Sequence, residues 1–118
     1  MKKGSNFSYN ELDDSLIISC NHRKERAKEN FIFDDIIFHL TENGKIIGLQ
    51  IRNASSILEE SGLNDEILDS LKEVQLNIIP KQDSLFIKIN LISDNKKENL
   101  SLGRIFMPKI QHQLTNLS

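Results

Sequence analysis

The chain has 118 residues, of which 38% are hydrophobic and 27% charged, proportions typical of one globular domain and not of a disordered chain. Its 15 basic and 17 acidic residues give a net charge of −2, which argues against a globally basic nucleic-acid-binding protein. Cys20 is the only cysteine, so no disulfide can form within the chain, and a reducing cytoplasm is the expected location. We find no apolar leader after Met1 and no apolar run of the roughly 18 residues that a membrane span needs, so neither a signal peptide nor a membrane segment is expected.

Alternating apolar residues predict the first strand over residues 15–20, with Leu16, Ile18 and Cys20 on one face. Between residues 31 and 40 the same alternation changes phase at Asp34-Asp35. We interpret this change as a β-bulge, because two residues opposite one would keep the apolar side chains on the same face.

A β-hairpin is predicted around Asn43-Gly44, a pair typical of two-residue type I′ turns. The expected register follows from such a turn and keeps the apolar residues together. It places Leu40 opposite Ile47, Phe38 opposite Leu49, Ile36 opposite Ile51, Glu42 opposite Lys45, and Asp35 opposite Arg52.

A helical pattern follows the hairpin. Ser56, with Glu59 three residues later, has the spacing of a capping box, and Asn64 suits the start of a second short helix. Strands are then predicted over residues 74–79 and 84–92. After Pro108, apolar residues at positions 110, 114 and 117 suggest a short amphipathic helix.

The two halves of the chain are similar to each other at an offset of 69 residues. Nine of the 32 positions from Phe7 to Phe38 are identical to those of the second half, and the apolar alternation also changes phase at Gly103-Arg104. We therefore predict an internal duplication and an α+β fold: two antiparallel β-meander halves joined by two short helices in a single domain, 1–118. The predicted parts are a first β-meander over 7–53, a helical connector over 55–72, a second β-meander over 74–108, and a tail over 109–118.

Several segments of the first half match a known pattern: Asp13-Asp14-Ser15-Leu16-Ile17-Ile18, Asp34-Asp35-Ile36-Ile37, the run from Glu42 to Ile51, and Asn53-Ala54-Ser55. Over about residues 7–58 the chain resembles domain of unknown function 2283, and the second half resembles a degenerate second copy. The resemblance implies a small antiparallel β unit from a prokaryotic protein and no established activity. It is weaker at the hairpin turn, where Thr41 or Glu42 stands in place of the family's aspartate, and at Gly48-Leu49-Gln50, where the family has a glutamate. Members are similar to proteins often encoded beside small toxin-like endonucleases, so an antitoxin-like role is an expectation by analogy.

No group of residues predicts an active site. Cys20 and His22 would share one face of a continuing strand, but no further ligand lies at a metal-binding spacing, and His39 is distant in sequence. Asp34 and Asp35 could be a general acid and base, but the bulge explains them more simply. We therefore expect no catalytic residue, no metal and no cofactor, and retain a small hydrolase or metal enzyme only as an alternative.

Apolar residues outside the main alternation indicate a binding surface. Because both faces of the strands carry apolar residues, we expect both to be covered, by the helices, by the other half or by a second protein. The leading hypothesis is a non-enzymatic protein–protein interaction module that forms a homo-oligomer or binds another small protein. Its candidate interface residues are Ile17, Ile37, Phe86 and Phe106.

The alternative function is binding of RNA or DNA, or of a small toxin as an antitoxin-like partner, through the basic loop 22–28. This loop could contact phosphates, although no aromatic residue in it could stack on a base. The candidate contacts are Arg23, Lys24, Arg26 and Lys28.

Overall fold

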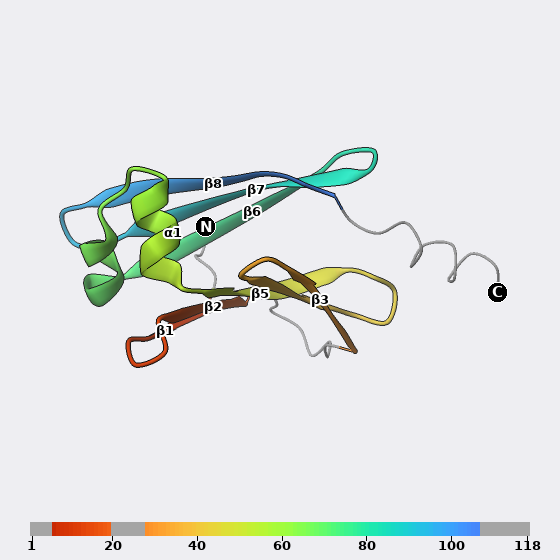
Figure 1. The fold of residues 1–118 in the computed structure, drawn as a ribbon, viewed down its shortest axis with the longest axis horizontal. Coiled ribbons are helices and arrows are strands. Elements are labelled where there is room, and N and C mark those ends of the chain that lie inside the picture. The colour runs from red at the N-terminus through yellow and green to blue at the C-terminus, as the bar shows by residue number, and fades with distance from the viewer. Residues whose placement is uncertain (1–5, 20–27, 107–118) are drawn as a thin grey trace.

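The fold consists of two antiparallel sheets that pack face to face, with two short helices at one end (Figure 1). The structure is a computed structural model, and it describes residues 6–19 and 28–106. For Arg104 and Phe106 it describes the backbone alone. The five-stranded sheet has the order β1-β2-β5-β4-β3 and the three-stranded sheet the order β6-β7-β8. The elements are β1 (Asn6–Asn10), β2 (Ser15–Ser19), β3 (Glu29–Phe33), β4 (Ile36–Leu40), β5 (Ile46–Arg52), α1 (Ala54–Glu60), the 3₁₀ helix η1 (Asp65–Ser70), β6 (Glu73–Pro80), β7 (Ser84–Ile92) and β8 (Lys97–Phe106).

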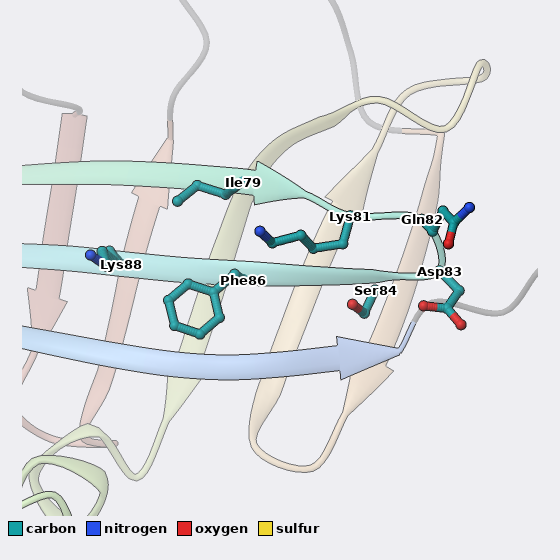
Figure 2. Close-up of a pocket in the computed structure, with 7 residues that line it drawn as sticks. All are labelled: Ile79, Lys81, Gln82, Asp83, Ser84, Phe86 and Lys88. Carbon is teal, nitrogen blue, oxygen red and sulfur yellow. The ribbon is translucent and has the colours of Figure 1, made fainter.

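One hydrophobic core lies between the two sheets. Every second residue of β2 and β7 is buried, as the alternation in the sequence predicts, and α1 and η1 close one end of the core. In Figure 2 the strands of the three-stranded sheet run across those of the five-stranded sheet behind them. The sheets therefore cover each other's inner faces, which is one of the expected covers, and the helices add Leu58, Ile67 and Leu68 to the same core. The residues buried to 1% exposure or less are Leu16, Ile18, Phe38, Leu40, Leu49, Ile51, Leu58, Ile67, Val74, Ile87, Ile89 and Leu91.

The hairpin between β4 and β5 has the predicted register over most of its length. Phe38 lies opposite Leu49 and Ile36 opposite Ile51, but a bulge near the turn places Leu40 opposite Ile46. The predicted pairing of Leu40 with Ile47 is therefore wrong.

The turn of this hairpin is a three-residue loop and not a two-residue type I′ turn. The Thr41 N–H donates to the Lys45 carbonyl at 2.8 Å, so Lys45 lies opposite Thr41 and not opposite Glu42. The Thr41 Oγ1 accepts from Asn43 N and Lys45 N, and only Gly44 has a positive φ, 84°. A single left-handed glycine closing a three-residue loop is the second common hairpin geometry.

The two predicted bulges differ in the structure. In β8, Gly103-Arg104 forms a bulge, because Ile105 lies opposite Leu85 while Leu102 lies opposite Ile87. Asp34-Asp35, by contrast, is the two-residue turn between β3 and β4, with Asp34 at a φ of 55°. The prediction of a bulge at Asp34-Asp35 is therefore wrong. A short acidic side chain tolerates the left-handed conformation that the turn requires.

The predicted duplication is not visible in the strand pairing. β7 pairs with β6 and β8, whereas β2 pairs with β1 and β5 and not with β3. Both sheets are antiparallel, and β2 and β7 each begin at the serine of an Asp-Ser pair, but the duplication itself stays a prediction.

The helices lie where the sequence predicts them, but α1 begins earlier. α1 starts at Ala54, after Asn53 at a φ of 55°, so Ser56 lies within the helix and does not cap it. η1 is capped as predicted, since the Asn64 side chain accepts from the Glu66 N–H at 2.9 Å.

Candidate interaction surface

A row of side chains crosses the outer face of the five-stranded sheet, which no other described element covers. Directly opposed residues of antiparallel strands point to the same face. The register places Ile17 beside Gln50, Gln50 beside Ile37, and Ile37 beside Ile32. We call the three isoleucines the apolar row: Ile17 is 41% exposed, Ile32 is 58% exposed, and Ile37 is half-buried.

Gln50 is the only polar side chain that interrupts the apolar row. Its Nε2 lies 3.4 Å from Ser15 Oγ, so the amide is directed along the sheet towards β2. At the end of the row, on β1, stands the exposed Ser8, opposite Ile17. The row therefore carries isoleucines on β2, β4 and β3, with Gln50 of β5 between Ile17 and Ile37, and it ends in a polar residue on β1.

Polar residues form the next row along the same face. His39 Nδ1 lies 3.0 Å from Asn30 Oδ1, which joins β4 to β3. Between His39 and Ser19 lies Gly48, and a Cβ at this position would lie only 2.8 Å from the Ile18 carbonyl oxygen. Gly48 therefore lets β5 approach β2 closely on the face that carries the apolar row.

The four predicted interface residues do not lie together. Ile17 and Ile37 belong to the apolar row. Phe86 is half-buried on the outer face of the other sheet, and the backbone of Phe106 pairs with Ser84 beside it, while the Phe106 side chain lies outside the described part of the chain. The structure thus divides the predicted interface between two opposite faces.

Phe86 lies in an open groove of about 830 Å³ on the outer face of the three-stranded sheet (Figure 2). A Cβ at Gly103 would lie 3.3 Å from the Phe86 Cε1, so the ring lies against the bulge of β8. The remaining lining residues are Ile79, Lys81, Gln82, Asp83, Ser84 and Lys88. Their mixture of apolar, basic and acidic groups does not select one class of ligand.

The basic loop lies largely outside the described residues, which include only Lys28 of the four candidate contacts. Lys28 is exposed, and its backbone N–H donates to the Leu40 carbonyl at 2.7 Å. Cys20 and His22 also lie outside the described residues, so the expectation that they share a face with one another stays a prediction.

A polar cluster that the sequence analysis did not identify joins β1, the β1–β2 loop and α1. The Asp14 carboxylate accepts from the Tyr9 hydroxyl at 2.6 Å and from the Ser55 hydroxyl at 2.7 Å. It also accepts from the Ser55 backbone N–H at 3.1 and 3.2 Å. Asp14 thus caps the first turn of α1 from a distant part of the sequence.

The electrostatics of this cluster are those of a structural cap. Partial burial is the largest single influence on the pKa of Asp14 and raises it, but the hydrogen bonds from Tyr9 and Ser55 together hold it below its ordinary value. Burial, and then the bond to Asp14, raise the pKa of Tyr9 well above its usual range. A carboxylate with a lowered pKa is a weak base, and the one at Asp14 accepts its hydrogen bonds from the first turn of α1, as a helix cap does.

No group of three or more His, Cys, Asp or Glu side chains within residues 6–19 and 28–106 is arranged to hold a metal ion. None of the helices in these ranges is long and apolar enough to cross a membrane.

The architecture defines a mostly antiparallel two-sheet protein whose helices are short. Residues 6–55 match the model of the family described as Protein of unknown function (DUF2283), which confirms the resemblance seen in the first half of the sequence. The matched segment runs from β1 to the first turn of α1 and contains the apolar row, Asp14 and Ser55. No curated protein and no solved structure matches the chain.

Proposed function

We propose that this protein is a non-enzymatic protein–protein interaction module of the cytoplasm, which binds its partner through the apolar row. The observation that supports the proposal is the alignment of Ile17, Ile37 and Ile32 in one cross-strand row on an outer sheet face. Single exposed apolar side chains are normal on protein surfaces, but several of them aligned in one row and bordered by polar residues are typical of an interface.

The border of the row supports the same function. Ser8 ends the row on β1, and Ser19, Asn30 and His39 border the isoleucines on one side with hydrogen-bonding groups, while the exposed Arg52 lies on the other side, opposite Ser15. Protein interfaces commonly combine an apolar centre, depleted in charge, with a polar rim. The partner is therefore a protein with a complementary apolar surface, either a second copy of this chain or another small protein.

The duplication of two β-rich halves is part of the same proposal. In an ancestral protein, two separate copies of one half would have associated, and the internal repeat would have joined them into one chain. Its support is the set of nine identities at the offset of 69 residues. The bulge in β8 lies at the position matched to the turn at Asp34-Asp35.

Ile17→Lys is the variant that tests the interaction, because it places a charge at the centre of β2 on the exposed face. Asn77→Lys is its control, since Asn77 is exposed on β6, on the opposite sheet. We expect Ile17→Lys to weaken binding of a partner to the apolar row, measured as capture from native lysate, by at least about tenfold, while Asn77→Lys leaves it unchanged. If Ile17→Lys and Asn77→Lys bind every partner of the unmodified protein equally well, the apolar row is not the interface.

Nucleic-acid binding by the basic loop is the second candidate function. Four basic residues against one acidic residue in loop 22–28 favour it, and the exposed Lys28 marks one end of the loop. Arg23→Glu combined with Arg26→Glu should then weaken RNA binding and reduce its dependence on salt. Absence of any retardation of mixed RNA by the unmodified protein at low salt would exclude it.

A further inference from the structure

The outer edge of β3 presents backbone groups that no described strand uses. β3 is the last strand of its sheet and pairs only with β4. The backbone groups of successive residues in a strand point alternately to its two neighbours. Because the Arg52 N–H donates to the Asp35 carbonyl at 2.7 Å, the odd-numbered residues of β4 bond to β5, and its even-numbered residues bond to β3. In β3 the partners of those even residues are Glu29, Phe31 and Phe33. The N–H and C=O groups of Asn30 and Ile32 therefore point away from the sheet.

The side chains of β3 do not protect this edge. Proteins commonly block exposed edges with proline, lysine or a bulge. Among the described edge strands, β1 exposes only the polar Asn6, Ser8 and Asn10, β6 ends in Pro80, and β8 carries the bulge at Gly103-Arg104. β3 has none of these features, and both Ile32 and Phe33 are exposed on it, at 58% and 38%.

We propose that β3 pairs in an antiparallel arrangement with β3 of a second copy of this chain, which joins the two five-stranded sheets into one. The inference rests on the proposed interaction function and adds a second contact to it, at the edge of the sheet that carries the apolar row. Full overlap of the five residues of β3 places the two-fold axis at Phe31. Asn30 of each copy then exchanges both backbone hydrogen bonds with Ile32 of the other, and the two Phe31 side chains meet.

This pairing continues interactions that the single chain already makes. Phe31 is half-buried, and its ring centroid lies 5.8 Å from that of Phe38. The two-fold pairing extends this to a run of four aromatic rings on the inner face, and on the outer face it brings the apolar rows of both copies into one sheet. A contact between two five-residue strands is smaller than the roughly 1,200 Å² of stable interfaces, so we expect a reversible dimer with a dissociation constant of about micromolar or weaker.

The experiment compares the full-length protein with Ile32→Pro and Ile32→Thr by sedimentation velocity from about 5 to 500 µM. Proline at position 32 removes an outward N–H that makes no bond to β4, and edge strands tolerate proline at such positions. Threonine keeps the N–H and a high strand propensity. We expect the mass of the unmodified protein to double with concentration, Ile32→Pro to stay monomeric, and Ile32→Thr to dimerise within about fivefold of the unmodified protein.

Hydrogen exchange gives a second measurement that does not depend on the folding of a variant. In the unmodified protein, the amides of Asn30 and Ile32 should become protected as concentration rises, by at least about tenfold, while that of Ser8 should not. A monomer at every concentration, or unchanged exchange at Asn30 and Ile32 in a dimer, would overturn the inference.

A dimer that persists in Ile32→Pro but is lost in Ile17→Lys would overturn edge pairing and support the apolar row. An edge-paired dimer that Ile17→Lys leaves intact, with no partner captured through the apolar row, would instead refute the proposed use of that row.

Discussion

Asp14 and Ser55 are 41 residues apart in the sequence and form three hydrogen bonds with each other, two from the Ser55 N–H and one from its hydroxyl. The Asp14 backbone carbonyl also accepts from the Ala54 N–H at 3.0 Å. These bonds join the start of β2 to the start of α1. Both residues fall within the segments that resemble the family, and the structure gives the physical reason for finding them in one motif.

Asp14→Asn should destabilise the protein, because the amide keeps the shape of the side chain but loses its charge and one of its two acceptor oxygens. Asparagine tolerates the φ of 56° at this position, so backbone strain does not contribute. We expect the free energy of unfolding in urea to fall by about 1–3 kcal/mol. The control is Asp13→Asn, an exposed neighbour, which should change it by less than about 0.5 kcal/mol. Equal effects of the two substitutions would contradict the capping role of Asp14.

The stability that Asp14 contributes should depend on pH in the acid range. Its pKa in the folded protein lies below the ordinary value of 3.8, so at a pH between the two values the unfolded chain binds more protons than the folded chain. The stabilisation is therefore present above about pH 4 and is lost as the pH falls through the folded-state pKa. Urea unfolding of the unmodified protein and of Asp14→Asn, repeated from pH 2 to 7, should show a difference that is constant above pH 5 and shrinks below pH 4. A difference that grows towards low pH would contradict this assignment.

Gly48→Ala should destabilise the five-stranded sheet. The new Cβ would lie 2.8 Å from the backbone oxygen of Ile18, which cannot move without displacing β2. We expect a loss of about 2–4 kcal/mol in the free energy of unfolding. Gly44→Ala is the comparison, because a Cβ there meets nothing within 4 Å and only the φ of 84° is unfavourable. That substitution should cost about 1 kcal/mol, and a larger loss for it than for Gly48→Ala would contradict the close approach of β5 and β2.

Phe38→Ala should remove a central part of the core, since this side chain is fully buried between the sheets. The cavity it leaves is expected to cost about 3–5 kcal/mol, measured by thermal or urea unfolding. Phe33→Ala, on an exposed side chain of the neighbouring strand, should cost less than about half as much. Similar losses for the two variants would indicate that the core does not lie between the two sheets.

Local patterns predicted much of the secondary structure. Alternation identified the buried faces of β2 and β7. The Asn43-Gly44 pair located the β4–β5 hairpin and the pairing of its residues away from the turn. The turn at Asp34-Asp35 has the sequence pattern of a bulge for a physical reason. A two-residue turn separates inward-facing residues by three positions, from Phe33 to Ile36, and the bulge in β8 separates Leu102 from Ile105 by the same number. The apolar pattern is therefore the same in both cases.

The sequence by itself determined which residues are apolar on each strand, where the chain can turn, and the family resemblance of its first half. Only the tertiary structure decided which strands become neighbours, because pairing between distant strands depends on how two whole sheets stack and not on local periodicity. That stacking brings Asp14 to Ser55, separates Ile17 from Phe86 on opposite faces, and leaves β3 at an edge. The candidate interaction surface is thus a product of strand order, which the alternation of apolar residues does not encode.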